Sequence, residues 1–301
     1  MSSKIDVKDL LKIEFGPEDR KLQSVLRAAF GANDVVLPRD PLWNARFFSL
    51  DNSRLFRSLS EDQQRDITAA LSQYLLTEAY AIEKIGMGFT AKMSLLSERL
   101  EDRMLYSAFA FDEASHFHMI SGYLEEQPRG LENSPFLSFL AKIIEDEDRD
   151  VLVVIIQVML EGWGMSHYRR MFEAATDIGF QDTMKRILKD EARHHGSGLA
   201  ILARSNLNNV QKKRVTDIMT EMLTMVRMGP QSVVAEVEKV VGGLSREQKA
   251  KLFFDLETET QSSERLAILR DLIPPECLFL RDRLDGANLF TPLTASQCAE
   301  I

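Results

Sequence analysis

The chain is poor in cysteine, in basic charge and in long apolar runs, and each shortage excludes a class of protein. Its 301 residues include only Cys277 and Cys298, 21 positions apart, which excludes a CxxC site, an iron–sulfur or rubredoxin-type site and a disulfide framework. The 46 acidic residues outnumber the 37 basic ones, for a net charge of −9, and no basic block occurs. Neither nucleic acid nor an anionic membrane is therefore expected as the main partner.

No segment is apolar enough to predict a membrane span or a leader. The most apolar run, residues 151–160, is about half the roughly 20 residues that a membrane-spanning helix needs. The opening residues, MSSKIDVKDLLKIEF, lack the uninterrupted apolar stretch of a signal peptide. The composition, 45% hydrophobic and 28% charged, is that of a soluble globular protein. We expect a cytoplasmic protein whose residues 1–301 form a single domain.

Proline and glycine are scarce as well, and the stretches between them are rich in strong helix formers. No run alternates β-branched and polar residues between turn signals, so the sequence predicts an all-α protein. Ser60 and Gln63 form a capping box that starts one helix, Ser97 is expected to cap the next, and Pro135 suits the first position of another. The predicted helices cover residues 17–29, 60–96, 97–126, 135–145, 148–176, 181–204, 208–227, 230–241 and 245–272, with a turn at 177–179 and an irregular tail after 274.

An internal repeat stands out among the predicted helices. The motif EKIGM, which begins at Glu83, returns as EGWGM at Glu161, and DEASH at Asp112 returns as DEARH at Asp190. Every matching position is offset by 78 residues, and each leading Glu lies 30 residues before the Glu of its ExxH. Because fifteen helical residues rise roughly 22 Å, a turn halfway between the two motifs returns the ExxH to the height of the leading Glu.

Two such hairpins, facing each other, would bring four carboxylates and two imidazoles together. Within each ExxH the Glu and the His share a helix face. This is the ligand set of a dinuclear carboxylate-bridged metal site in a four-helix bundle. The sequence therefore predicts a metal site with the ligands Glu83, Glu113, His116, Glu161, Glu191 and His194.

The alternative to a metal site is a helical duplication whose charges face solvent. A single ExxH is usually a surface pair, but two copies with the same upstream Glu are more specific. Burying four carboxylates without counter-charge would be prohibitive, whereas two cations would neutralise them. The solvent-facing alternative also fails to explain the apolar residues interspersed with the motifs. These are Tyr80, Phe89, Phe109, Phe111, Phe117, Trp163 and Met165.

Other polar residues near the motifs compete for roles at the site. Glu78 could replace Glu83 as the first ligand, but its spacing to Glu113 would be 35 rather than 30, so the repeat favours Glu83. His118, His167 and His195 are expected to have structural or supporting roles.

The duplicated ligand set resembles the ferritin-like di-iron carboxylate superfamily over residues 60–204. The resemblance implies a ferritin-like four-helix bundle core over that range, with additional N-terminal helices and a helical C-terminal extension over residues 205–301. The DEAxH motifs are similar to the DExRH pair of bacterial di-iron monooxygenases. In that family the Asp before each ExxH holds the histidine of the other hairpin, which implies pairs of Asp112 with His194 and of Asp190 with His116. Arg193 matches the family's Arg, which pairs with such an Asp.

Departures from the family's branches leave the subfamily open. The second ExxH histidine, which ferritins usually lack, points to an oxygen-activating enzyme. Ile120 stands where ribonucleotide reductase small subunits place a radical Tyr, and Ile187 stands where the p-aminobenzoate N-oxygenase family has a third His. Two distant cysteines cannot build the electron-transfer module that rubrerythrins usually carry.

The resemblance implies an oxygenase or oxidase with two iron ions and O₂ as co-substrate, acting on a small organic substrate. The ligand types also suit manganese or a mixed Mn/Fe pair. An external reductase or ferredoxin is expected as electron donor, because the chain has no flavin or iron–sulfur motif. A homodimer, a ferroxidase function and a non-catalytic scaffold with a structural metal are left open.

Glycines follow both leading glutamates and have two explanations. A glycine inside a helix costs about 1 kcal/mol relative to Ala, and Gly86 and Gly164 each lie three residues after a predicted ligand. They either permit close helix packing or leave room for O₂ and substrate beside the metals. On the second explanation an apolar pocket would be lined by Phe111, Phe117, Trp163, Met87 and Met165.

Overall fold

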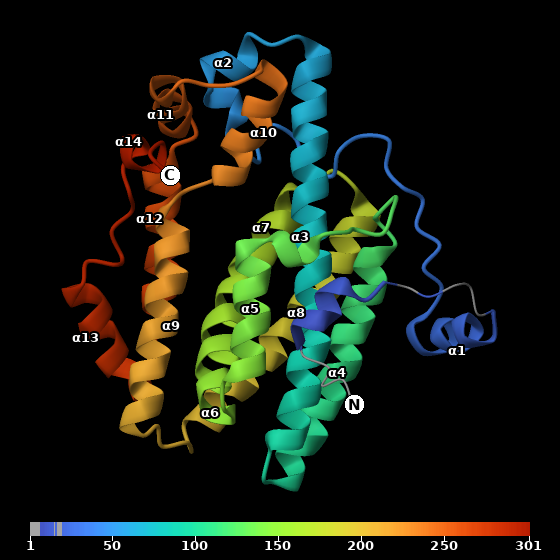
Figure 1. Cartoon of the computed structure of the whole chain (residues 1–301). Coiled ribbons are helices and arrows are strands. Elements are labelled where there is room, and N and C mark those ends of the chain that lie inside the picture. The colour runs from blue at the N-terminus through green and yellow to red at the C-terminus, as the bar shows by residue number, and fades with distance from the viewer. Residues whose placement is uncertain (1–6, 15, 17–19) are drawn as a thin grey trace, which may run out of the picture. The chain divides into compact units, whose positions relative to one another are not determined.

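The computed structural model of the chain is built from helices (Figure 1). It describes residues 7–14, 16 and 20–301, and no β-strand occurs within these residues. The predicted all-α fold is therefore confirmed. The predicted helix over 17–29 is α1, Arg20–Phe30, and positions 17–19 lie outside the described residues.

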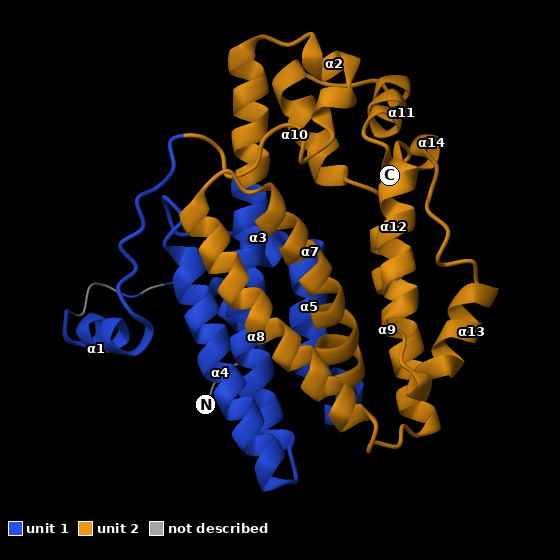
Figure 2. Ribbon diagram, turned by 180° about the vertical axis from the view of Figure 1, so that it is seen from behind, with its two compact units in different colours: residues 1–39, 73–152 blue, residues 40–72, 153–301 orange. Residues whose placement is uncertain are grey.

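Two compact units divide the chain, residues 1–39 with 73–152 and residues 40–72 with 153–301 (Figure 2). The helix α3 begins in the second unit and continues in the first. The single domain over 1–301, with its core over 60–204, stays a prediction. The first unit contains η1 (Val7–Lys12), α1, α3 (Glu61–Leu96) from residue 73 on, α4 (Leu100–Ser121), η3 (Leu131–Asn133), α5 (Pro135–Asp146) and α6 (Arg149–Leu152).

The second unit contains the remaining elements. It also includes the first residues of α3, up to residue 72. Its other elements are η2 (Leu50–Asn52), α2 (Arg54–Arg57), the π-helix η4 (Val153–Leu160), α7 (Glu161–Ala174), α8 (Ile178–Leu202), α9 (Asn209–Arg227), α10 (Gln231–Val241), α11 (Arg246–Asp255), α12 (Thr258–Asp271), η5 (Pro275–Cys277), α13 (Leu278–Gly286) and α14 (Ala295–Cys298).

Local capping signals fix the start of α3 as predicted. The backbone N–H of Ser60 donates to Gln63 Oε1, and the backbone N–H of Gln63 donates to Ser60 Oγ, so both partners of the capping box are present. The helix ends at Leu96, the predicted residue.

The predicted cap at Ser97 is wrong. Its hydroxyl donates to the carbonyl of Met93, which belongs to the helix that ends, and Arg99 takes the cap position of α4. The helix α4 also stops at Ser121 rather than at residue 126.

The helix α5 is anchored at both ends. Pro135 occupies the first position, and the Ser134 hydroxyl accepts from the backbone N–H of Leu137. At the other end Lys92 of α3 donates to the carbonyls of Ile144, Glu145 and Glu147. A cation at a helix C-terminus satisfies carbonyls that have no helical partner. Burial nevertheless lowers the pKa of Lys92.

A π-helical segment interrupts the long helix predicted over 148–176. The stretch is helical throughout Arg149–Ala174 but adopts π geometry at Val153–Leu160. The predicted turn at 177–179 lies earlier, because Asp177 caps α8 by accepting from the backbone N–H of Phe180, and α8 begins at Ile178.

The C-terminal region is more broken and more helical than predicted. The helix predicted over 245–272 is two helices, α11 and α12, because Glu257 between them has a positive φ of 55°. The predicted irregular tail contains η5, α13 and α14. In the second unit a hydrophobic core joins η2, α2 and the start of α3 to α10, α11 and α14.

The sequence predicts no membrane span because the run over 151–160 is short, but among the described residues the longer helical stretch Arg149–Ala174 is long and apolar enough to cross a membrane. Its most apolar window is 61% buried inside the protein, as in the core helix of a soluble protein.

Candidate metal centre

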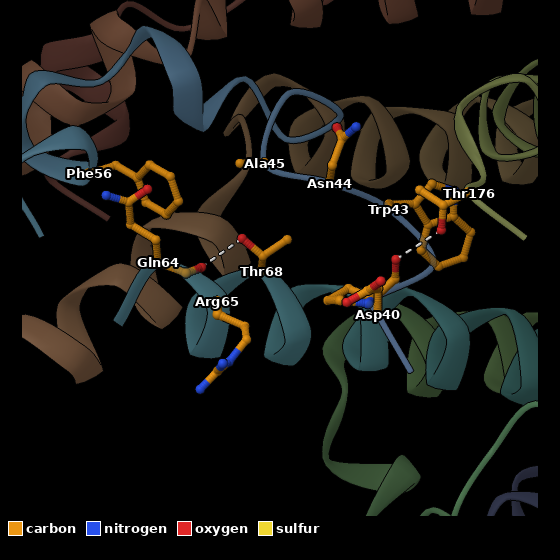
Figure 3. Close-up of a pocket in the computed structure, with 10 residues that line it drawn as sticks. Asp40, Trp43, Asn44, Ala45, Phe56, Gln64, Arg65, Thr68 and Thr176 are labelled. Carbon is orange, nitrogen blue, oxygen red and sulfur yellow. Dashed lines mark hydrogen bonds between the residues drawn. The ribbon is translucent and has the colours of Figure 1, made fainter. Parts of the chain in front are cut away.

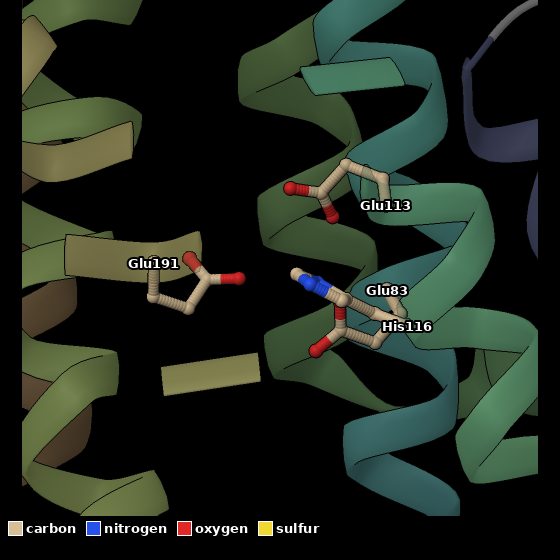
Figure 4. Close-up of side chains that lie close together, drawn as sticks. All are labelled: Glu83, Glu113, His116 and Glu191. Carbon is tan, nitrogen blue, oxygen red and sulfur yellow. The ribbon is translucent and has the colours of Figure 1, made fainter. Parts of the chain in front are cut away.

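The first unit brings three of the predicted ligands together. Glu83 of α3 and Glu113 and His116 of α4 place one ligand atom each within 4.8 Å of one another (Figure 4). Their side chains are buried, with exposed fractions of 2%, 6% and 0%. We call these three residues the first triad.

Contacts along the α3–α4 hairpin show why the triad forms. Ser94 lies opposite Ser107 near the turn, and Glu83 lies opposite His116 further along, with Glu83 Oε2 3.2 Å from His116 Nδ1. The paired positions run in opposite directions, so the two helices are antiparallel and the 30-residue spacing places Glu83 and Glu113 at the same height. Nδ1 is thus the ring nitrogen of His116 that faces the carboxylate of Glu83.

The competing residue Glu78 lies elsewhere on α3. Its carboxylate neighbours the Tyr74 hydroxyl, where burial followed by the charge of Glu78 raises the pKa of Tyr74 to about 12. The structure thus places Glu83 in the first triad and Glu78 beside a tyrosine.

The second unit holds the other three predicted ligands in a matching arrangement. Glu161 of α7 and Glu191 and His194 of α8 place ligand atoms within 4.8 Å of one another. His194 is fully buried, Glu191 is buried and Glu161 is half-buried. Glu191 Oε2 lies 3.6 Å from His194 Nδ1, so the same ring nitrogen faces a carboxylate here. We call these residues the second triad.

Gln157 supports the second triad and was not predicted from the sequence. It is fully buried in the π-helix η4, and its amide donates to the carbonyl of His194 and to the hydroxyl of Ser197, each at 2.9 Å. A Cβ at Gly198 would lie 2.8 Å from Gln157 Cγ, so this glycine admits the glutamine. The only signal in the sequence is that Gln157 is the one polar residue in a long apolar run.

The residues predicted to orient the histidines lie beside the triads in sequence. Arg193 forms an ion pair with Asp190 at 3.1 Å, the pairing that the resemblance implies for this Arg. Asp112 is half-buried on α4. The predicted pairs of Asp112 with His194 and of Asp190 with His116 stay predictions.

Aromatic rings pack against one another on α3 and α4, the two helices that carry the first triad. Tyr80 packs on Phe117 with ring centroids 4.6 Å apart, and Phe89 meets Tyr106 edge to face at 6.2 Å. Phe111, predicted to line an apolar pocket, is 52% exposed and packs against Phe30, so its ring belongs to the outer face of α4.

The three remaining histidines have structural surroundings. His118 lies 3.3 Å from the carbonyl of Gly31 and beside the ring of Phe30. The ring of His195 lies against Gly162, where a Cβ would meet it at 2.9 Å. Burial, aided by the charges of two arginines, lowers the pKa of His167 to about 4, so this side chain is neutral at pH 7. The arginines are Arg265 and Arg170.

A pocket of about 260 Å³ in the second unit contains none of the predicted site residues (Figure 3). Trp43 and Phe56 supply apolar surface, and the polar groups around them hold the local fold. Thr68 donates to the carbonyl of Gln64, and Thr176 donates to that of Pro41. The complete lining consists of Asp40, Pro41, Trp43, Asn44, Ala45, Phe56, Gln64, Arg65, Thr68 and Thr176.

The donor set of each triad fits a metal ion. Two carboxylates and one imidazole, all within 4.8 Å, suit iron or manganese better than the softer thiophilic metals. Burial of such carboxylates is unfavourable unless a positive charge compensates for it. Each triad could therefore hold a metal ion. Comparison with protein-family models, with curated protein sequences and with solved structures finds no match to this chain, so the ligand geometry carries the functional argument.

Proposed function

We propose that the two triads together bind a pair of iron ions and that the protein is an O₂-dependent di-iron oxidase or oxygenase. The observation that carries the proposal is the duplication of one set of candidate ligands, of which every member except the half-buried Glu161 is buried. Each triad has a leading Glu on one helix and an ExxH on the next, at an offset of 78 residues. Four carboxylates and two histidines are the ligand number of a dinuclear centre, and neither triad alone supplies it.

The chain's own residues would hold the metals, neutralise them and keep water away. The carboxylates would compensate the positive charge, and the imidazoles of His116 and His194, whose Nδ1 atoms lie near Glu83 and Glu191, would supply nitrogen ligands. Glu83, Glu113 and His116 are themselves buried, which would limit the access of water to the first triad. When bound, a pair of iron ions supplies the capacity to activate O₂ for oxidation of an organic substrate.

The proposal also includes a small organic substrate and a separate electron donor. A separate electron donor is included because the two thiols of the chain are poorly suited to redox chemistry. Burial raises the pKa of Cys277 to about 12 and also raises that of Cys298, so both stay protonated at neutral pH.

Iron binding tests the proposal directly. Metal-free protein is loaded with Fe(II) without oxygen, its iron content is measured, and Mössbauer spectra are recorded before and after exposure to air. We expect two irons per chain that oxidise together and couple magnetically. One iron or none at saturation would contradict the proposal, and hundreds of irons per chain would make the protein an iron store.

A further inference from the structure

Gly86 of α3 lies against one of the predicted ligands. A Cβ built on Gly86 would stand 2.1 Å from Glu113 Oε2 and 2.8 Å from its Cδ. Real Cβ atoms essentially never approach another atom so closely, so Glu113 occupies the space that a side chain at position 86 would need. The carboxylate of the first triad therefore depends on this glycine for its position.

The repeat provides a second glycine with different surroundings. Gly164 lies three residues after Glu161, as Gly86 lies three residues after Glu83. A Cβ on Gly164 would meet no atom within 4 Å. Equivalent positions in the two copies thus differ, because one is filled by a carboxylate and the other borders open space.

We propose that Gly86 is a positioning residue for the first triad, where it makes room for the carboxylate of Glu113. This inference rests on the proposed function, because it assigns to Glu113 the role of metal ligand. It differs from a packing role for the glycine, since the atoms nearest to Gly86 belong to the Glu113 side chain and not to the backbone of another helix.

The physical chemistry predicts that Gly86→Ala folds but binds metal poorly. Alanine is the better helix former by about 1 kcal/mol. The atoms that an added Cβ would strike are the far end of a flexible side chain, so the carboxylate can turn aside without moving α4. The substitution should therefore displace the ligand and leave the helices in place.

The experiment compares Gly86→Ala with its matched control Gly164→Ala. Thermal unfolding of the metal-free proteins reports folding, and Fe(II) affinity is measured anaerobically by competition with a chelator. We expect both variants to melt at or above the wild-type temperature. Iron affinity should fall about 10–100-fold in Gly86→Ala, as for loss of a group that orients a ligand, and stay unchanged in Gly164→Ala.

A double-mutant cycle with Glu113→Ala separates a positioning role from a structural one. If Gly86 acts through Glu113, then Gly86→Ala has no further effect on iron affinity in the Glu113→Ala background. Wild-type affinity in Gly86→Ala, or an equal loss in both backgrounds, would overturn the inference and leave the proposed function standing. A wild-type protein that binds no iron would remove the proposed function, and this inference with it.

Discussion

The two copies of the repeat bring together the same three residue types, two Glu and one His, in different surroundings. In the first copy Glu83, Glu113 and His116 are all buried, whereas in the second Glu161 is only half-buried. The helices of the first copy carry packed aromatic pairs, and the second copy is supported by the amide of Gln157. The two copies therefore share the residue types of the candidate ligands and differ in the side chains that surround and support them.

Positions related by the 78-residue offset show how the surroundings differ. Gln157 and Gly198, which lie against each other in the second copy, correspond to the buried residues Ala79 and Ile120 in the first. The large residue is the first member of the pair in the second copy and the second member in the first copy. His167 corresponds to Phe89. The second copy has polar groups where the first has apolar ones, and this contrast can be tested by exchange of residues.

Loss of a ligand should produce the largest effect. Glu83→Ala removes a carboxylate of the first triad and should lower iron content below two per chain. Glu78→Ala should retain both irons, because Glu78 lies beside Tyr74. Elemental analysis after anaerobic loading measures both. Full occupancy in Glu83→Ala together with loss in Glu78→Ala would place the first ligand more than one helical turn away from the triad described here.

Exchange of His167 for its counterpart should change the response to acid. The pKa of His167 is about 4 in the folded protein and about 6.5 when unfolded, because burial and nearby arginines disfavour its charged form. Between these values the unfolded chain binds more protons, so the free energy of unfolding falls as pH drops from 6.5 towards 4. At about 1.4 kcal/mol per pKa unit, the loss is about 3 kcal/mol.

The variant His167→Phe should lack this contribution. Urea unfolding at pH 7.5 and at pH 4.5 measures it as the difference between wild type and variant, which subtracts the titration of the carboxylates common to both. Parallel curves over this range would show that His167 titrates normally.

Asp190→Asn tests whether Asp190 orients a metal-binding histidine, which the resemblance predicts to be His116. We expect the ligands to stay in place and iron affinity to fall about 10–100-fold, the usual effect of altering a group that orients a metal-bound histidine. Chelator competition measures it, and Asp182→Asn on the same helix is the control. Unchanged affinity would limit Asp190 to its ion pair with Arg193.

The smallest effect is expected at Gln157. Gln157→Met keeps the length of the side chain and removes the hydrogen bonds to His194 and Ser197. The free energy of unfolding of the metal-free protein should fall by about 0.5–1.5 kcal/mol per hydrogen bond lost. A variant as stable as wild type would mean that an apolar side chain, as at the equivalent position of the first copy, stabilises the second copy equally well.

Local signals in the sequence predicted the parts of the fold that depend on local interactions. The Ser60–Gln63 capping box and Pro135 predict helix starts because their partners lie within one turn. Ser97 carries the same kind of signal, yet its hydroxyl donates to the carbonyl of Met93 in the preceding helix. A serine between two helices can hydrogen-bond to the end of one or cap the start of the other. The break between α11 and α12 at Glu257 contains no proline or glycine from which it could be predicted.

The ligands were predictable for a different reason from their supports. Spacing alone places Glu83 opposite Glu113 in an antiparallel hairpin, and the second copy repeats the pattern. Gln157 and the filled space at Gly86 depend on which side chains meet across helices, and a single sequence does not specify these contacts.

The π-helix η4 ends immediately before Glu161, the first ligand of the second triad. A π-helical turn with i→i+5 bonds holds more residues than the 3.6 of an α-helical turn, so a residue after the segment faces another direction than it would at the end of an uninterrupted α-helix. The segment therefore sets the rotational phase at which Glu161 emerges. Substitutions within Val153–Leu160 should be tolerated where volume and π geometry are kept, whereas a change that made the segment α-helical without removing a residue would turn Glu161 away from Glu191 and His194.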